Sequence, residues 1–222
     1  MIRLVDACRT YKDGNDEVYA LDHVNLEIKA NEFVSIMGVS GAGKTTLLNV
    51  LGGMDRLTSG SYIYDGVEIE SFDNREMISF RKKNVGFVFQ DFALLNNYTV
   101  YENVEFPLLV SKVNAKDRRD KIYDILKKVG IEKLAEKKPV KLSRGQCQRC
   151  AIARAMVTGC NLILADEPTG SLDTHTMESI MILFKEFHES GRTIILVTHD
   201  ERVASYAERT IFIADGKIIQ YR

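Results

Sequence analysis

The 222-residue sequence lacks the features that mark membrane-spanning, secreted and nucleic-acid-binding proteins. No apolar stretch approaches the roughly 18 residues that a transmembrane helix needs, and the N-terminus carries no long apolar signal region. The formal net charge is −1, so there is no basic excess to attract nucleic acid. We therefore expect a protein that is made and kept in the cytoplasm and that has no nucleic-acid partner.

Cysteine and proline are also scarce, with four and three residues respectively. Cys147 and Cys150 form a C-x-x-C spacing, which can indicate redox chemistry or a metal site. They lie inside an expected helix over residues 146–156, however, and no second cysteine pair completes a zinc site. A cytosolic chain of this size with four cysteines does not suggest a disulfide framework, so we interpret all four as buried or partly buried thiols.

The most informative stretch is a glycine-rich loop that matches the pattern G-x-x-x-x-G-K-S/T over residues 38–45. Its glycines allow successive backbone N–H groups to face one point at a helix N-terminus, where an anion is favoured. Lys44 can reach the β- and γ-phosphates of a nucleotide, and the Thr45 hydroxyl can bind Mg²⁺. The apolar run 33–37 predicts a strand before the loop, and the spacing of residues 46–51 predicts a helix after it. This setting indicates a triphosphate site rather than an ordinary glycine turn.

Short apolar runs predict an N-terminal part made of strands, and the character of the chain changes near residue 91. We expect a helix at residues 74–81 and strands at residues 2–8, 24–28, 33–37, 61–64, 67–69 and 85–89. Two charged helices are expected at residues 98–104 and 115–129. The runs 161–165 and 193–197 are continuously apolar, which is typical of a parallel sheet covered on both faces. The remaining expected elements are helices at 174–190 and 201–207 and a hairpin of strands 210–214 and 217–220.

These elements predict an α/β fold in a single domain that spans residues 1–222. We expect residues 1–90 and 143–222 to form a P-loop NTPase core, with a parallel sheet, helices and an N-terminal antiparallel β part. Residues 91–142 are expected to form a helical subdomain inserted into this core.

Polar residues follow the two apolar strands of the second half. Asp166 and Glu167 end the first strand, where Asp166 can help to hold Mg²⁺ and Glu167 can accept a proton from an attacking water. His199 follows the second strand, at the edge of the sheet that faces the ligand crevice. A lone histidine at such a position also has a purely structural interpretation.

A second candidate site for an anion precedes the expected helix at residues 146–156. Ser143 and Gln146 have the spacing of a capping box, which predicts that the helix begins there. A capped helix N-terminus presents free N–H groups and a positive dipole end to an anion.

Taken in order, these motifs resemble the nucleotide-binding subunit of ATP-binding cassette (ABC) transporters. The phosphate loop is followed by Gln90, by Leu142-Ser143-Arg144-Gly145-Gln146, by the stretch from Leu164 to Asp173 and by His199-Asp200. The resemblance covers essentially the whole chain.

The resemblance implies a role for each matching residue. Tyr11 would stack on the adenine ring, and Gln90 would sense the metal and the lytic water. Asp166 would be the metal-side acid, Glu167 the general base, and His199 a contact to the γ-phosphate. Asp173 would lie in a loop that communicates across a dimer. The phosphates and Mg²⁺ would be held by Gly38, Ser40, Gly41, Ala42, Gly43, Lys44, Thr45 and Thr46. A signature loop containing Ser143, Gly145 and Gln146 would bind the nucleotide that the other subunit holds.

The family's way of working implies partners as well as cofactors. Two copies would close around two ATP molecules with Mg²⁺, and hydrolysis would release them. A separate transmembrane permease would move the substrate, so the subunit would lie on the inner face of the cell membrane. Its coupling helix would enter a cleft near Gln90 that is lined by residues 91–101, with apolar contacts from Phe92, Leu94, Leu95 and Tyr98. The alternative for each of these four side chains is to pack in the core of the helical lobe itself.

Several stretches are similar to the subfamily of macrolide exporters, lipoprotein-release systems and antimicrobial-peptide transporters. They include residues 99–104, 107–109 and 166–173. This similarity implies that the permease exports or extracts a peptide, a drug or a lipoprotein.

One residue departs from the family pattern. The usual signature is Leu-Ser-Gly-Gly-Gln, and Arg144 stands in place of its first glycine. Arg144 either points away and leaves hydrolysis normal, or hinders closure and weakens the dimer. A catalytically weakened regulatory subunit and a soluble ABC ATPase without a transporter therefore stay as alternatives.

A GTPase is disfavoured because no Asn-Lys-x-Asp motif, which GTPases use to select the base, occurs in the sequence.

Overall fold

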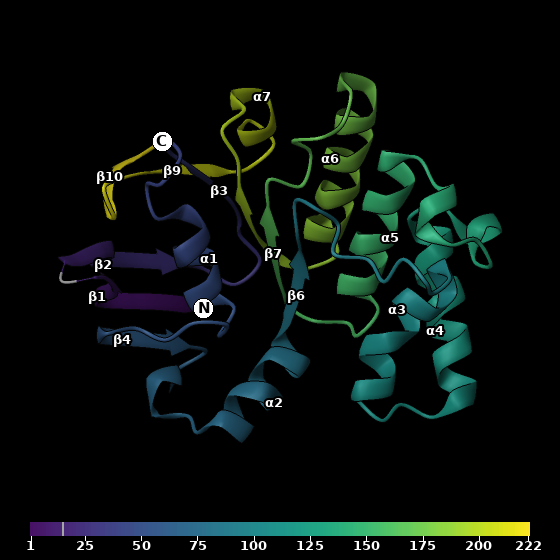
Figure 1. The fold of residues 1–222 in the computed structure, drawn as a ribbon, viewed down its shortest axis with the longest axis horizontal. Coiled ribbons are helices and arrows are strands. Elements are labelled where there is room, and N and C mark those ends of the chain that lie inside the picture. The colour runs from purple at the N-terminus through teal and green to yellow at the C-terminus, as the bar shows by residue number, and fades with distance from the viewer. Residues whose placement is uncertain (15) are drawn as a thin grey trace.

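The computed structural model describes residues 1–14 and 16–222, which form two sheets and a group of helices (Figure 1). The larger sheet has six strands in the order β10-β9-β3-β8-β7-β6. Its strands are β3 (Phe33–Met37), β6 (Val85–Val88), β7 (Leu162–Asp166), β8 (Thr193–Val197), β9 (Arg209–Ala214) and β10 (Lys217–Tyr221). All neighbouring pairs are parallel except β9 and β10, which form an antiparallel hairpin.

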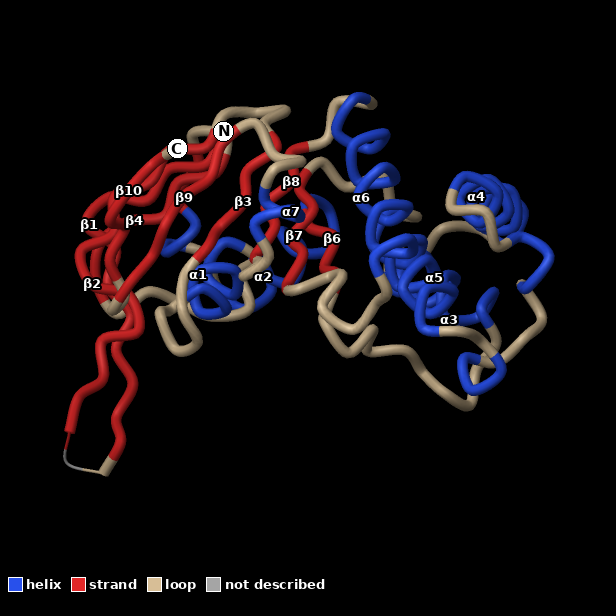
Figure 2. Tube along the Cα trace, turned by 90° about the horizontal axis from the view of Figure 1, so that it is seen from above, coloured by secondary structure: helices blue, strands red, loops and turns tan. Residues whose placement is uncertain are grey.

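The smaller sheet is antiparallel and has the order β2-β1-β4-β5. Its strands are β1 (Ile2–Asp13), β2 (Asp16–Ile28), β4 (Ser59–Tyr64) and β5 (Val67–Glu68). The β1–β2 hairpin projects from the molecule in Figure 2. The predicted strands 2–8 and 24–28 were therefore too short, because the first four residues of β2 are all exposed and carry no alternating apolar signal.

Seven α-helices lie within the described residues. They are α1 (Lys44–Leu51), α2 (Asn74–Asn84), α3 (Val100–Val110), α4 (Ala115–Lys128), α5 (Arg144–Met156), α6 (Thr174–Glu189) and α7 (Glu201–Ala204). Short 3₁₀ turns occupy Ile69–Ser71, Glu132–Leu134 and Pro139–Lys141. None of these helices combines the length and the apolar character that crossing a bilayer demands.

The predicted helix 98–104 was misplaced. Helix α3 begins at Val100 because the side chain of Thr99 accepts a hydrogen bond from the Glu102 N–H and forms a capping box. It then continues through Pro107 to Val110. The predicted helix 201–207 was too long, since α7 ends at Ala204. The predicted strand 67–69 ends at Glu68, because Ile69 already belongs to a 3₁₀ turn.

The six-stranded sheet is buried on both faces. Along β8, Ile194 and Leu196 join an apolar cluster with α5 and α6, while Ile195 and Val197 join a second cluster with α1 and the smaller sheet. This alternation explains why the strand reads as a continuous apolar run. It confirms the predicted α/β class with a parallel sheet and an N-terminal antiparallel part.

Helices α3, α4 and α5 lie together at one end of the molecule (Figure 1 and Figure 2). Val104 and Leu108 of α3, and Ile122 and Leu126 of α4, belong to the same buried cluster as Ile152 of α5. Helices α3 and α4 therefore pack into the same apolar core as α5, on one face of the six-stranded sheet. The division into a core and an inserted subdomain stays a proposal.

Asn103 fixes the segment that leads into α3. Its side chain is fully buried, accepts a hydrogen bond from Leu95 N at 2.8 Å, and donates to Leu95 O at 3.1 Å and Thr99 O at 2.8 Å.

Replacing Asn103 with leucine leaves buried backbone groups without partners, so we expect Asn103→Leu to lower the free energy of unfolding by about 2–4 kcal/mol. Urea denaturation measures this change. The exposed neighbour substitution Asn97→Ala serves as control and should stay within about 0.5 kcal/mol of the wild type.

Candidate functional site

The glycine-rich loop joins β3 to α1 and is held between the two sheets. A side chain at Gly43 would collide with the carbonyl oxygen of Ala20 on β2, and one at Gly38 would collide with that of Ile213 on β9. Gly43 also has a φ of 100°, in the left-handed region that favours glycine. These contacts explain why the loop needs glycine at both positions.

The remaining loop residues differ in their exposure. Ser40 and Gly41 are exposed at the tip of the loop, Ala42 is buried, and Thr46 lies half-buried in the first turn of α1. Lys44 donates hydrogen bonds from Nζ to Gly38 O at 2.8 Å and to Val39 O at 2.7 Å, so its ammonium group lies within the loop. No side chain caps the N-terminus of α1, which leaves its first N–H groups available to an anion.

Thr45 and Asp166 meet where β7 ends. The Thr45 hydroxyl donates to Asp166 Oδ2 at 3.0 Å. Burial raises the pKa of Asp166, and the Thr45 hydrogen bond and the charge of Lys44 offset only part of this effect. A hydroxyl and a carboxylate are the hard oxygen ligands that Mg²⁺ prefers, so this pair fits such an ion.

Glu167 and His199 form a hydrogen-bonded pair at the same edge. His199 Nδ1 lies 2.7 Å from Glu167 Oε1. Glu167 has a φ of 45°, and its N–H donates to Val197 O at 3.0 Å, which turns the chain sharply at the end of β7. The His199 side chain is 74% exposed, so it does not serve the packing of the core. Both residues line a cavity of about 210 Å³ together with Gly170 and Thr198.

Gln90 follows β6 and lies beside the same segment. Its Nε2 would be 3.8 Å from a side chain at Gly170, in the turn that begins with Glu167. The structure thus brings Gln90, Glu167 and His199 to one region of the sheet edge.

The signature loop forms the start of α5, as the capping-box prediction required. Ser143 Oγ accepts from Gln146 N at 3.3 Å, and Ser143 N donates to Gln146 Oε1 at 3.0 Å. A side chain at Gly145 would lie 2.5 Å from Thr176 Cγ2 of α6. Asp173 caps α6 through Thr176 N at 3.0 Å and accepts from the Thr176 hydroxyl at 2.6 Å. Asp173 and the signature loop are therefore neighbours in one protomer.

The signature loop and the phosphate loop belong to different layers. Helix α5 covers one face of the six-stranded sheet and α1 covers the other. No hydrogen bond among residues 1–14 and 16–222 joins the two loops. The two candidate sites for an anion in one protomer are thus separate.

Tyr11 is held by two residues that the sequence reasoning missed. Its hydroxyl donates to Asp55 Oδ2 at 2.5 Å, and the Arg9 guanidinium lies 4.5 Å from the centre of its ring. Burial tends to raise the pKa of Asp55, but hydrogen bonds from Tyr11 and Arg56 N–H, with the charge of Arg9, hold that pKa below its usual value. Arg9 and Tyr11 share one face of β1 through their i, i+2 spacing, which is a signal available in the sequence. The partner Asp55 comes from a distant loop and leaves no such signal.

All four cysteines are free and buried, as expected. Burial raises the pKa of the Cys150 thiol to about 12 and that of Cys160 to about 11. Burial raises the pKa of the Cys147 thiol as well, so both thiols of the C-x-x-C pair are buried, free and mostly protonated at neutral pH.

Comparison with known proteins places these motifs in a single family. The profile of a family described as ABC transporter matches residues 21–170. The chain belongs to the ABC transporter family. It is 48% identical to the uncharacterized ABC transporter ATP-binding protein YvrO of Bacillus subtilis, over 99% of this chain and 96% of that protein. It is 42% identical to the macrolide export ATP-binding/permease protein MacB of Vibrio parahaemolyticus, but it spans only 34% of that protein.

Solved structures confirm the predicted fold. The ATP-binding cassette MJ0796 of Methanocaldococcus jannaschii, in a dimeric post-hydrolysis state with ADP and Pi, matches with a TM-score of 0.93. That match has 43% identity and covers 100% of this chain and 98% of that chain. The chain is accordingly an ATP-binding subunit of the ABC type and an ATPase.

The half-buried charge of Asp166 predicts a gain in stability when it is removed. A carboxyl whose folded pKa is raised binds more protons in the native state, so stability falls as pH rises through that pKa. Asp166→Asn keeps an acceptor for Thr45 and removes the charge. We expect a higher melting temperature than the wild type at pH 7 without nucleotide, and a difference that shrinks toward pH 4.

Thermal denaturation between pH 4 and pH 8 measures this difference. Asp200→Asn is a control of opposite sign, because the hydrogen bond from Arg202 lowers the pKa of Asp200. A melting temperature below that of the wild type at pH 7 for Asp166→Asn would contradict the prediction.

Proposed function

We propose that ATP-driven pairing of two copies, followed by hydrolysis, powers a separate membrane permease. The observation that carries this proposal is the Glu167–His199 hydrogen bond of 2.7 Å at the sheet edge where Thr45 meets Asp166. A base and a candidate metal site at one edge are what hydrolysis of a bound triphosphate requires.

Each residue has one task in this proposal. Lys44 and the first N–H groups of α1 hold the β- and γ-phosphates, and Thr45 and Asp166 hold Mg²⁺. When bound, this ion offsets the negative charge of the phosphate oxygens. Glu167 accepts a proton from the attacking water through its carboxylate, and His199 holds that carboxylate in place. Gln90 is positioned beside them to orient the water.

The two anion sites of one protomer point to a shared site in a pair. Ser143 and Gly145 lie at a capped helix end on the layer opposite the phosphate loop, so they serve the nucleotide of a second copy. Tyr11, backed by Arg9, offers its ring to adenine on the first copy. The dimeric structure of MJ0796, a relative at 44% identity, supports this arrangement. ATP then links the two copies, and its hydrolysis weakens the link.

Blocking the base should trap the pair. Glu167→Gln keeps the shape of the side chain but cannot take up the proton, so we expect a dimer on adding Mg²⁺ and ATP and a fall in ATPase rate of about a hundredfold or more. Size-exclusion chromatography with light scattering measures the dimer. The exposed substitution Glu189→Gln is the matched control and should behave as the wild type. A Glu167→Gln protein that stays monomeric in saturating ATP would count against paired sites.

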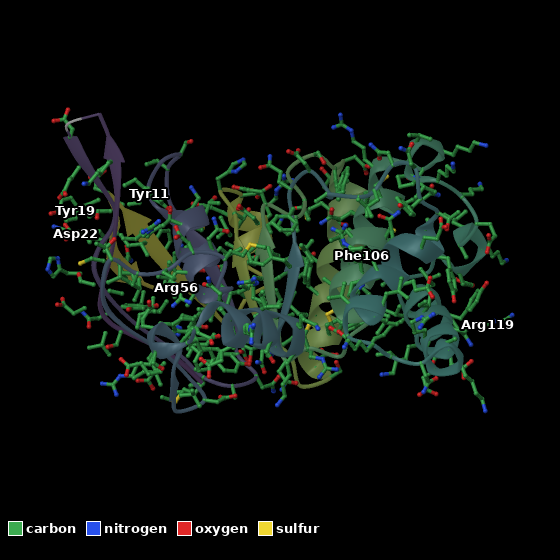
Figure 3. The ribbon with its side chains drawn as sticks, turned by 60° about the horizontal axis from the view of Figure 1, so that its bottom comes forward. Tyr11, Tyr19, Asp22, Arg56, Phe106 and Arg119 are labelled. Atoms are coloured by element: carbon green, nitrogen blue, oxygen red, sulfur yellow. The ribbon has the colours of Figure 1, made fainter. Side chains whose placement is uncertain are left out.

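A hollow of about 440 Å³ beside β6 and α3 is the proposed docking place for the permease. Its apolar lining includes Phe87, Phe89, Phe106, Pro107 and Val110, and its charged lining includes Arg81, Lys82 and Arg154. We propose that it takes an amphipathic cytoplasmic helix of the permease that carries an acidic residue. The subunit would thereby lie on the inner face of the membrane. Figure 3 shows Phe106 on the helical side of the molecule, away from Tyr11.

The cleft expected near Gln90 and this hollow share only part of their lining. Of the predicted lining residues 91–101, Ala93 contributes to the hollow. Phe92, Leu94, Leu95 and Tyr98 do not line it, and Leu94 packs against the buried core instead. The reason is tertiary, because Arg154 of α5 donates hydrogen bonds to the backbone oxygens of Phe92 and Ala93 and so turns this segment.

A charge placed in the hollow should uncouple the two proteins. Phe106 is 53% exposed, so Phe106→Asp removes apolar contact without a cavity in the core. We expect co-purified permease to fall by about tenfold or more, while the ATPase rate of the isolated subunit stays within about twofold. Ile182→Asp on α6, where Ile182 is 52% exposed, is the control and should leave co-purification unchanged. Equal recovery of permease with Phe106→Asp would place the docking surface elsewhere.

A further inference from the structure

Arg144 replaces a glycine of the family signature and makes a contact that glycine cannot make. We propose that Arg144 is a positioning residue, which ties the start of α5 to the loop that carries Glu167. This inference rests on the proposed function, since it assigns Arg144 a part in the ATPase cycle.

The contact itself is a hydrogen bond between two functional segments. Arg144 donates from Nη1 to Ser171 O at 3.3 Å. Ser171 belongs to residues 167–173, which run from the base to the cap of α6. The guanidinium is thereby directed along its own protomer, and Ser143 at the start of α5 stays exposed.

The loop of residues 167–173 is held by hydrogen bonds within its own backbone. Gly170 N donates to Glu167 O at 3.1 Å, and Leu172 N donates to Thr169 O at 3.0 Å. The first turn spans residues 167–170, and the second spans residues 169–172 and includes Ser171. A restraint on Ser171 is therefore passed through two short turns to Glu167, and from there to His199.

The packing beside Arg144 explains which signature glycine can be replaced. A side chain at Gly145 would lie 2.5 Å from Thr176 Cγ2, so that position has no room. Arg144 is the first residue of α5 and is not among the residues with positive φ, so its backbone accepts any L-residue. Thr176 in turn donates hydrogen bonds to Asp173, so Arg144 and Gly145 both lie against the C-terminal part of this loop.

Arg144 therefore links two segments of one protomer that belong to different ATP sites of the pair. The signature loop serves the nucleotide of the opposite copy, and Glu167 serves the nucleotide of its own copy. Arg144 joins them by a polar contact in addition to the packing of Gly145. Engagement of the signature loop by the second copy is thus transmitted to the position of the base.

The test uses the full chain with Arg144→Ala, which keeps the helix and removes the guanidinium. We expect amide hydrogen exchange in peptides covering residues 167–176 to rise about threefold or more without nucleotide. We expect kcat for ATP to fall about three- to tenfold, with KM unchanged within about twofold, because the base is mispositioned while binding is kept. Arg144→Lys, which can still donate to Ser171 O, should restore at least about half of the lost kcat. Lys141→Ala, an exposed cation three residues earlier, is the control and should change neither measurement.

Several results would overturn the proposal. Unchanged exchange in residues 167–176 would show that Arg144 does not hold the loop. A rise in kcat for Arg144→Ala would show that the side chain obstructs closure. Weaker ATP-dependent pairing in a Glu167→Gln background, with unchanged exchange, would show that Arg144 acts on the opposite copy. A wild-type protein without ATPase activity would refute the proposed function, while the exchange experiment would still decide whether the link exists.

Discussion

The carboxyl edge of the six-stranded sheet is the constraint on which the rest of the site depends. Because the strands are parallel, residues that follow β3, β7 and β8 emerge at the same edge. That edge brings Thr45 to Asp166 and Glu167 to His199, although these pairs are 121 and 32 positions apart in the sequence. The hydrogen-bond ladders of the strands hold these residues at one edge of the sheet.

The same arrangement is locally unfavourable in free energy. Asp166 is partly buried, with a raised pKa, and Glu167 is held in the left-handed region of φ. A charge and a strained backbone at one strand end are unfavourable without ligand, and they persist because the core on both faces of the sheet over-determines their place. The apolar core of the sheet thus holds Asp166 and Glu167 in positions that are unfavourable on local grounds.

Sequence reasoning was most accurate where one physical signal dominates. Phe33–Met37 and Thr193–Val197 were predicted to the residue, because both are fully buried apolar runs bounded by polar residues. The phosphate loop and the capping box at Ser143 were found because local backbone demands select few residue types. The exposed end of β2 carries no apolar pattern, so its length was not predictable. The hollow beside α3 and the clamp of Asp55 on Tyr11 depend on segments that meet only in the folded chain.

Helix α5 connects the signature loop to the proposed docking hollow. Helix α5 has 13 residues, which corresponds to about 20 Å. It begins at the signature loop and reaches Arg154 and Ala155, which line the hollow beside α3. It packs against α3 and α6 in one buried cluster, which restricts its movement relative to both helices. In the proposed complex, a permease helix that tilts α5 at the hollow would also displace the signature loop at the other end of the same helix.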